Sequence, residues 1–307
     1  LLRQQRKVEP HRLQKSFEGP LYNVVNFRVG LRLILLQYMS SFFTNKVVAI
    51  TGGSEGIGKA LIDALIPLGA KVATCGRNYD KLYNLQMEYT NVMLHTVVAD
   101  VSKEADCRKF IESTLETFGD IDILINNAGI SMRALFEEAE LEVFRKVMDI
   151  NFFGSVYCTK FALPSLIKKQ GMIIGISSIA GYRGLPGRSA YSASKFALQG
   201  WLEAIRTEML DKQVHVMWVS PGFTTSNIRN AALNAKAQSQ GESPMDEGSM
   251  MSAEECAEHI LHAMEKRKRS LVLTFTGKRT VFMNRFFPAW TDKLTHNFFF
   301  RDGKLVK

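Results

Sequence analysis

Short apolar segments alternate along the chain with segments whose apolar residues recur every three or four positions, from about residue 46 to residue 276. Most of the short segments are apolar almost throughout, as strands buried on both faces of a parallel sheet are. The segments between them have the spacing of amphipathic helices that pack one face on a sheet. We predict strands at residues 47–51, 71–76, 93–99, 121–126, 171–177, 215–220 and 270–275.

The helical spacing is clearest between the first two predicted strands. There, Ala60, Leu61, Ala64, Leu65 and Leu68 fall on one side of a helix. Repeated strand–helix–strand units of this kind build an α/β fold with a doubly wound parallel sheet. Because the alternation is unbroken, we predict a single domain.

Residues 226–250 interrupt this rhythm. They are rich in Ala, Asn, Gln, Ser and Gly and include Pro244. Loops that cover active sites are drawn from the less stable segments of a protein. We expect a mobile lid here, followed by a helix whose first turn carries a capping box formed by Ser252 and Glu255.

The predicted domain spans residues 45–276, and both ends of the chain lie outside it. Residues 1–44 form an N-terminal extension with little periodicity, in which Met39 is a candidate natural start. The alternative is an Arg-rich targeting or membrane-surface arm. Residues 277–307 form a C-terminal segment in which basic and aromatic residues are interleaved, as suits peripheral contact with an anionic membrane. The alternative is that these aromatic side chains pack under the domain or at a subunit interface.

The net charge of +9 is concentrated at the two ends. Residues 1–38 carry seven basic against two acidic side chains, and residues 267–307 carry ten against two. The remaining residues carry 22 basic against 26 acidic side chains. A nucleic-acid groove needs clustered cations across the body of the protein, so we expect no nucleic-acid partner.

Cysteine and histidine usage argues against metal or disulfide chemistry. The four cysteines are far apart and have no metal-binding or redox spacing, which favours a reducing, cytoplasmic compartment. His259 and His262 form a single His-x-x-His pair without a third candidate ligand, so we expect no metal site. No apolar run approaches the roughly 18 residues that a membrane-spanning helix requires.

A glycine-rich turn, Thr51-Gly-Gly-Ser-Glu-Gly-Ile-Gly58, joins the first predicted strand to the first predicted helix. Glycines here allow a tight turn and a close backbone approach to a pyrophosphate, which the helix N-terminus attracts. This arrangement is typical of a Rossmann-type dinucleotide-binding domain. We assign Gly52, Ser54, Gly56, Ile57 and Gly58 to the cofactor site.

The end of the second strand indicates which dinucleotide binds. An acidic residue at this position would accept hydrogen bonds from the adenosine ribose of NAD, but the chain has Arg77 instead. A guanidinium suits a 2′-phosphate, so we predict NADP(H), although Arg77 could also be a solvated loop cation. Asp100 and Val101 follow the third strand, where Asp100 either contacts the adenine or caps a helix.

Tyr191, Lys195 and Ser178 carry the strongest catalytic signal. At positions i and i+4 the tyrosine and the lysine share one helix face. We expect the nearby ammonium to lower the phenol pKa from its ordinary value of about 10, so that Tyr191 can exchange a proton with a substrate oxygen. Ser178 ends a strand, and its hydroxyl could stabilise charge on that same oxygen.

Taken together, these motifs resemble those of the short-chain dehydrogenase/reductase family over roughly residues 45–275. The resemblance implies that Asn151 holds a proton-relaying water and that Lys195 also binds the nicotinamide ribose. It further implies homodimers or homotetramers built on the helices that contain Asn151 and Tyr191. The residues that it adds to the cofactor site are Asn127, Ala128, Gly129, Tyr191, Lys195, Pro221, Gly222 and Thr224.

The sequence therefore predicts an NADP(H)-dependent oxidoreductase that interconverts a small-molecule ketone and a secondary alcohol. The substrate is apolar or lipid-like if the C-terminal segment meets a membrane. The alternative is a catalytically silent regulatory or scaffold protein that retains the cofactor fold. Such a protein would be expected to have lost Ser178, Tyr191 or Lys195, and all three are present.

Overall fold

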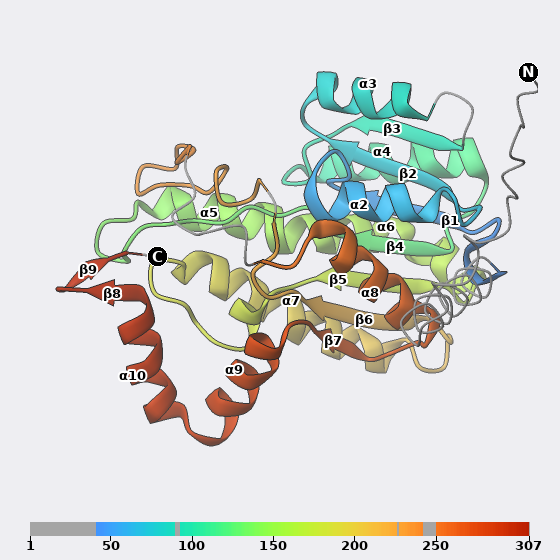
Figure 1. Ribbon diagram of the computed structural model, residues 1–307. Coiled ribbons are helices and arrows are strands. Elements are labelled where there is room, and N and C mark those ends of the chain that lie inside the picture. The colour runs from blue at the N-terminus through green and yellow to red at the C-terminus, as the bar shows by residue number, and fades with distance from the viewer. Residues whose placement is uncertain (1–40, 90–92, 226, 242–249, 307) are drawn as a thin grey trace, which may run out of the picture.

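The computed structural model describes residues 41–89, 93–225, 227–241 and 250–306. Its centre is a seven-stranded parallel sheet with the strand order β3-β2-β1-β4-β5-β6-β7 (Figure 1). This order confirms a single Rossmann-type, doubly wound α/β domain. The strands are β1 (Val47–Thr51), β2 (Lys71–Gly76), β3 (Leu94–Val98), β4 (Ile123–Asn126), β5 (Met172–Ile176), β6 (His215–Ser220) and β7 (Ser270–Val272).

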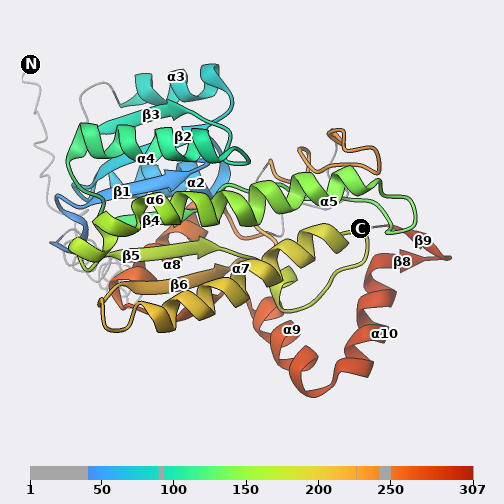
Figure 2. The same cartoon turned by 180° about the vertical axis from the view of Figure 1, so that it is seen from behind.

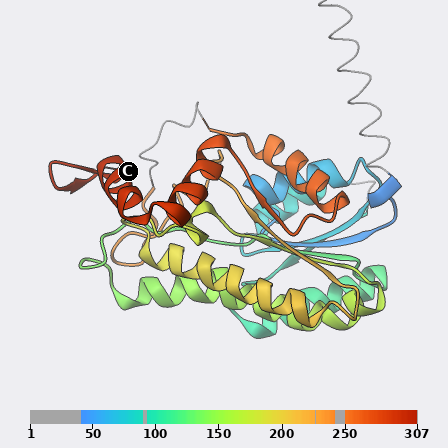
Figure 3. The ribbon, with the colours of Figure 1, turned by 90° about the horizontal axis from the view of Figure 1, so that it is seen from below.

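Helices cover both faces of the sheet. One face carries α2 (Gly56–Leu65), α3 (Tyr79–Glu88) and α8 (Ala253–Glu265), and the other carries α4 (Glu104–Phe118), α6 (Gly154–Lys168) and α7 (Ser189–Glu208) (Figures 2 and 3). Each face buries its own apolar cluster. The stripe predicted for the first helix is part of the first cluster, where Leu61 and Leu65 are fully buried.

The predicted strands match the structure closely where the apolar runs are sharply bounded. Residues 47–51, 71–76 and 215–220 are strands as predicted, and the other predicted runs are longer than the strands that form. The largest difference is in β7, which ends at Val272 because Thr274 caps a new helix by accepting a hydrogen bond from the Gly277 N–H.

The fold begins before the predicted boundary at residue 45. Phe43 is fully buried among core residues on the α2 side of the sheet, and Phe42 packs beside it. In the sequence, these two phenylalanines stand between Ser41 and Thr44 without the apolar periodicity of a helix or strand, so their burial could not be predicted. The predictions for Met39 and a basic arm concern residues 1–40, which lie outside the described residues.

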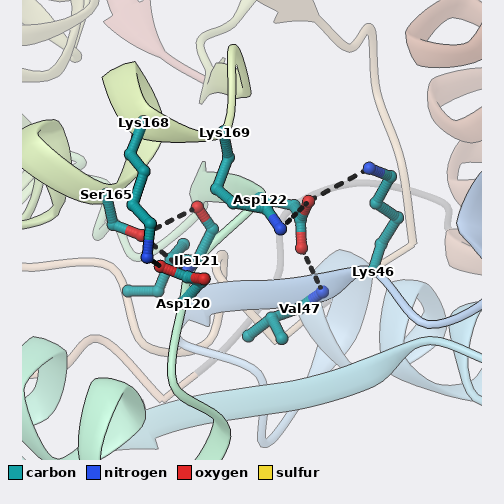
Figure 4. A network of polar contacts seen from close by, with 8 residues as sticks. All are labelled: Lys46, Val47, Asp120, Ile121, Asp122, Ser165, Lys168 and Lys169. Atoms are coloured by element: carbon teal, nitrogen blue, oxygen red, sulfur yellow. Dashed lines mark hydrogen bonds and ion pairs between the residues drawn. The ribbon is translucent and has the colours of Figure 1, made fainter.

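The amino ends of the central strands are joined by a network of paired charges (Figure 4). One carboxylate oxygen of the buried Asp122 accepts a hydrogen bond from the Val47 N–H at 3.0 Å. Its other oxygen lies 3.0 Å from the Lys46 ammonium and 3.8 Å from that of Lys169. These contacts tie β1, β4 and α6 together at the end of the sheet opposite the glycine-rich turn.

The C-terminal segment forms two helices, α9 (Phe275–Phe286) and α10 (Pro288–Phe299), and a short hairpin of β8 (Phe300–Arg301) and β9 (Lys304–Leu305). It projects from the side where the sheet strands end, as Figure 1 shows in red. Asn284 donates a hydrogen bond to the Tyr182 carbonyl at 2.9 Å, and Phe298 stacks on Phe223. One side of the segment therefore packs on the domain, while other aromatic side chains are exposed. None of the helices in the described residues is long and apolar enough to cross a membrane.

Candidate active site

A cavity of about 670 Å³ lies at the carboxyl ends of β1 to β4, where the glycine-rich turn meets the sheet. This is the position at which parallel α/β sheets bind ligands. Most residues that the sequence assigned to the cofactor surround it. They are Gly52, Ser54, Gly56, Ile57, Arg77, Asp100, Val101, Asn127, Ala128 and Gly129.

The glycine-rich turn leaves a helix N-terminus open to this cavity. Gly52 has a φ of +70°, and a Cβ there would lie 3.0 Å from the Ala128 Cα, so a larger residue is excluded. Among the described residues no side chain caps the N-terminus of α2. Its free N–H groups and helix dipole are therefore available to a phosphate, and the turn fits the pyrophosphate of a dinucleotide.

Asn127 holds the turn to the end of β4. Its amide donates hydrogen bonds to the carbonyls of Thr51 at 3.0 Å and Gly52 at 2.9 Å. In return, the Thr51 hydroxyl accepts hydrogen bonds from the N–H groups of Asn127 and Ala128. Gly58 does not line the cavity but lies just behind it, where a Cβ would be 2.3 Å from the Gly52 carbonyl oxygen.

At the adenosine end, the cavity is lined by Arg77, Asn78, Lys81 and Asp100. Arg77 is exposed, and no ion pair to it occurs in the described parts of the chain. Lys81, which the sequence analysis did not name, pairs with Glu55. Asp100 accepts hydrogen bonds from the backbone N–H and hydroxyl of Ser102, so its carboxylate shapes the turn before α4 while facing the cavity.

A second cavity of about 130 Å³ adjoins the first, because Ile57 and Ile228 line both. It brings together residues from the ends of β5 and β6 and from the start of α7. The predicted residues that line it are Ser178, Tyr191, Lys195, Pro221, Gly222 and Thr224.

Ser178, Tyr191 and Lys195 meet in this smaller cavity. The Ser178 hydroxyl accepts a hydrogen bond from the Ala180 N–H at 3.2 Å and also hydrogen-bonds with Tyr191. The Lys195 ammonium donates to the Ile176 carbonyl at 2.8 Å and lies 5.7 Å from the centroid of the Tyr191 ring. The hydroxyl groups of a serine and a tyrosine can thus approach one substrate oxygen together.

The pKa of Tyr191 differs from our expectation. Burial raises it, and the Ser178 hydrogen bond and the charge of Arg188 act in the opposite direction without reversing the net shift. The expected lowering is therefore wrong in its net direction for the protein alone, because the desolvation of the phenol is the larger effect. Burial also lowers the pKa of Lys195 to about 8, which leaves its ammonium charged near neutrality.

Asn151 is fully buried in a π-helical turn, Asp149–Phe153, between α5 (Leu141–Met148) and α6. Its side chain accepts a hydrogen bond from the Ile130 N–H at 2.8 Å and donates to the Ile130 carbonyl and to the Ser194 hydroxyl, each at 2.9 Å. These bonds connect the end of β4 to the helix that carries Tyr191. Turns of this type often occur at functional sites.

Several residues that line the two cavities carried no signal in the sequence. Arg188 and Arg229 line the smaller cavity, while Asn227, Ile228 and Ala231 reach the larger one. Asn227, Ile228 and Ala231 fall in the predicted lid, whose composition marked the segment but not the residues that face inward. Ser226 and residues 242–249 of that segment lie outside the described residues.

No group of three or more potential metal ligands occurs within the described ranges. His259 and His262 lie on the exposed face of α8, each within 4 Å of a glutamate oxygen. The His259–Glu255 pair is typical of a solvated helix face, whereas the Glu265 side chain that His262 contacts is only 5% exposed.

Comparisons with known proteins agree with this geometry. The family model described as short chain dehydrogenase matches residues 46–237. A mouse protein, dehydrogenase/reductase SDR family member 7B, is 36% identical over 265 residues, which cover 83% of this chain and 82% of the mouse protein. A mosquito protein from Anopheles gambiae, dehydrogenase/reductase SDR family protein 7-like, is 33% identical over 269 residues, or 83% and 85% of the two chains.

Solved structures share the fold. A short-chain dehydrogenase/reductase from Burkholderia phymatum in complex with NAD has a TM-score of 0.71 at 21% identity, over 79% of this chain and 94% of that one. A 3-ketoacyl-(acyl-carrier-protein) reductase from Brucella melitensis complexed with NADH has a TM-score of 0.66 at 23% identity, over 75% and 96% of the two chains. With its family model, its relatives and its nucleotide-binding fold in agreement, the chain belongs to the short-chain dehydrogenase/reductase family of oxidoreductases.

Proposed function

We propose that the protein interconverts a ketone and a secondary alcohol with NADP(H). The observation that carries this proposal is the meeting of Ser178, Tyr191 and Lys195 in a small cavity that opens into the cofactor cavity. A carbonyl oxygen held by Ser178 and Tyr191 would place its carbon beside that opening. The nicotinamide, when bound, supplies or accepts the hydride.

Tyr191 moves the proton in this scheme. Its phenol, whose pKa is raised, is protonated at neutral pH and can donate to the substrate oxygen as negative charge develops there. Ser178 donates a second hydrogen bond to the same oxygen. When Tyr191 has donated its proton, the positive charges of Lys195 and Arg188 stabilise the resulting phenolate. In the reverse reaction, this phenolate accepts the proton of the alcohol.

Asn151 positions these groups. Its side chain links Ile130 to Ser194, one residue before Lys195, so the lysine is fixed relative to the floor of the cofactor cavity. We further propose that a water near Asn151 passes protons between Lys195 and solvent. Pro221, Gly222 and Thr224 form the wall against which the carboxamide of the cofactor would bind.

The preference for NADP(H) rests on the adenosine end of the larger cavity. Arg77 and Lys81 provide cations there, and no acidic residue ends β2. A guanidinium without a carboxylate partner in the described residues is suited to a 2′-phosphate. The competing possibility, a cofactor-binding scaffold without turnover, is disfavoured because the catalytic groups share one cavity and retain their hydrogen bonds.

Assembly and membrane contact are further parts of the proposal. Phe153 and Phe196 are 39% and 47% exposed near the helices expected to form a homodimer or homotetramer interface. On the C-terminal segment, exposed aromatic rings alternate with cations, as suits an anionic membrane surface. The exposed rings are Phe275, Phe282, Phe286, Phe287 and Trp290, and the cations among them are Lys278, Arg279 and Arg285.

A turnover screen tests the central proposal. Ketones of different size and charge would be offered with NADPH and with NADH, using the native protein and its Tyr191→Phe variant. We expect NADPH oxidation that depends on a ketone and on Tyr191. Binding of NADPH without turnover of any ketone or alcohol would favour the scaffold function.

A further inference from the structure

A buried glutamine lies on the same helix as the catalytic tyrosine and lysine. Gln199 of α7 is only 8% exposed, although glutamine is mostly found at protein surfaces. It follows Lys195 by four residues, as Lys195 follows Tyr191, so the three side chains share one face of the helix. A buried primary amide costs free energy unless it is hydrogen-bonded. Its partners therefore indicate on which part of the site this amide acts.

The amide of Gln199 connects the ends of two strands to α7. Its Nε2 donates hydrogen bonds to the Ser177 hydroxyl at 2.7 Å, just after β5, and to the Ser220 hydroxyl at 3.3 Å, at the end of β6. It also lies 3.5 Å from the carbonyl oxygen of Ser178. The Ser177 hydroxyl donates in turn to the Lys195 carbonyl at 3.5 Å. This network therefore joins β5, β6 and α7 around the backbone of Ser178.

The turn that follows Ser178 is shaped to admit this amide. Gly181 ends the short 3₁₀ turn Ile179–Gly181, and a Cβ there would lie 2.4 Å from the Gln199 Nε2. A larger residue is therefore excluded at this position unless the glutamine moves. The Gly181 N–H also donates a hydrogen bond to the Ser178 carbonyl at 2.9 Å. The Ser178 backbone is thus held both by its own turn and by the glutamine.

The position of the Ser178 backbone determines where the Ser178 hydroxyl points. This hydroxyl hydrogen-bonds with Tyr191, and both residues line the smaller cavity. A displacement of about 1 Å at a reacting group can lower a rate about 10²-fold. Gln199 is not among the described residues that line either cavity, so it can influence the reaction only through its neighbours.

We propose that Gln199 is a positioning residue, whose amide holds the Ser178 backbone so that the hydroxyls of Ser178 and Tyr191 meet at one substrate oxygen. This inference deepens the proposed function and rests on it. Buried hydrogen-bond networks whose members are satisfied hold those members rigidly. Without the amide, the hydroxyls of Ser177 and Ser220 lose a donor, and the end of β5 can shift relative to α7. Ser178 would then stabilise charge on the substrate oxygen less well, and its hydrogen bond with Tyr191 would weaken.

The kinetic test uses Gln199→Met, which removes the amide and keeps a side chain of similar length. We expect kcat for ketone reduction to fall about 10- to 100-fold, with the KM for NADPH close to its native value. In a Ser178→Ala background the same substitution should have almost no further effect, because the amide acts through that serine.

Gln86→Met is the matched control. The Gln86 amide ties α3 to β3 through the Leu94 carbonyl at 3.0 Å, so its loss should leave kcat unchanged. Ser177→Ala removes the acceptor nearest to the Gln199 Nε2 and should lower kcat in the same direction, which keeps the test decisive if Gln199→Met does not fold. Native kcat in the folded variants, or losses that multiply with that of Ser178→Ala, would overturn the inference.

Titration of Tyr191 provides a second readout that does not need turnover. In the NADP⁺-loaded protein, NMR of ring-labelled tyrosine follows this titration, and the Tyr191 signal is identified by its loss in Tyr191→Phe. The hydrogen bond with Ser178 acts to lower the pKa of the phenol, so the titration should move to higher pH in Gln199→Met and stay in place in Gln86→Met. If no ketone reacts but this shift occurs, the proposed reaction fails and the positioning role stands. If the titration does not move, the positioning role is overturned, whether or not ketones react.

Discussion

Charged residues gather at both ends of the parallel sheet, but the two groups have different surroundings. At the amino ends, the carboxylate of Asp122 contacts Lys46, Lys169 and a backbone N–H, so that the buried charge is compensated (Figure 4). At the carboxyl ends, Arg188 and Lys195 are equally buried and have no carboxylate partner in the described part of the chain.

The presence or absence of an oppositely charged partner distinguishes charges that stabilise the fold from charges that act on a ligand. A compensated buried charge contributes to stability, and its loss should lower the free energy of unfolding. An uncompensated buried charge makes the ligand-free protein less stable. Its desolvation cost is offset only when an anionic ligand binds or negative charge develops in the transition state. Substitutions at the amino ends should therefore change stability, and substitutions at the carboxyl ends should change turnover.

The largest effect is expected at Tyr191. Tyr191→Phe removes only the oxygen that carries the proton, so turnover should fall by about 10²- to 10⁴-fold. Affinity for NADPH, measured by fluorescence titration, should stay close to the native value. Retention of more than a tenth of the activity would show that another group transfers the proton.

Asp122 tests the other end of the sheet. Asp122→Ala leaves the Val47 N–H without its acceptor and removes the partner of Lys46, so the free energy of unfolding should fall by about 2 to 3 kcal/mol. The measurement is chemical denaturation, with kcat/KM as a second readout that should not change. Asp120→Ala is the matched control, since the exposed Lys168–Asp120 pair should have little influence on stability. A loss of activity at native stability would contradict the comparison.

The uncompensated charge of Lys195 should make the free energy of unfolding depend on pH. Its pKa is about 8 in the folded protein and about 10.5 when unfolded, so between these values the unfolded chain binds more protons. The contribution of this lysine to stability should therefore increase as pH rises through 8. Relative to Lys195→Met, the cofactor-free native protein should gain about 2 kcal/mol of unfolding free energy between pH 8 and pH 10. If the free energies of unfolding of the two proteins changed with pH in parallel, the charge of Lys195 would be compensated in the folded protein.

The smallest of these effects is expected at Arg77, which is exposed and so partly screened by solvent. Arg77→Ala should reduce the preference for NADPH over NADH by about tenfold, or about 1.4 kcal/mol. The ratio of kcat/KM values for the two cofactors measures this preference. Equal use of both cofactors by the native enzyme would refute the NADP(H) assignment.

The sequence by itself determined the features that depend on short-range order. Apolar runs of five or six residues predicted most of the strands, because a strand buried on both faces needs apolar side chains at every position. The Thr51–Gly58 turn and the spacing of Tyr191 and Lys195 are equally local, since glycine conformation and helix geometry act over a few residues. These signals were enough to predict the fold, and most of the residues that they named line the two cavities.

Only the tertiary structure decided which side chains from separate segments meet and how deeply they are buried. The meeting of Ser178, Arg188 and Arg229 in the smaller cavity depends on the loops after two different strands and on the start of a helix, which no local pattern connects. The raised pKa of Tyr191 and the place of Phe43 in the core depend on burial, which the sequence does not specify at single positions. The C-terminal segment packs against the catalytic side because Phe298 and Phe299 find apolar and cationic partners there. Phe275, Phe282 and Trp290 of the same segment are each more than half exposed, so this stretch of sequence serves two different environments.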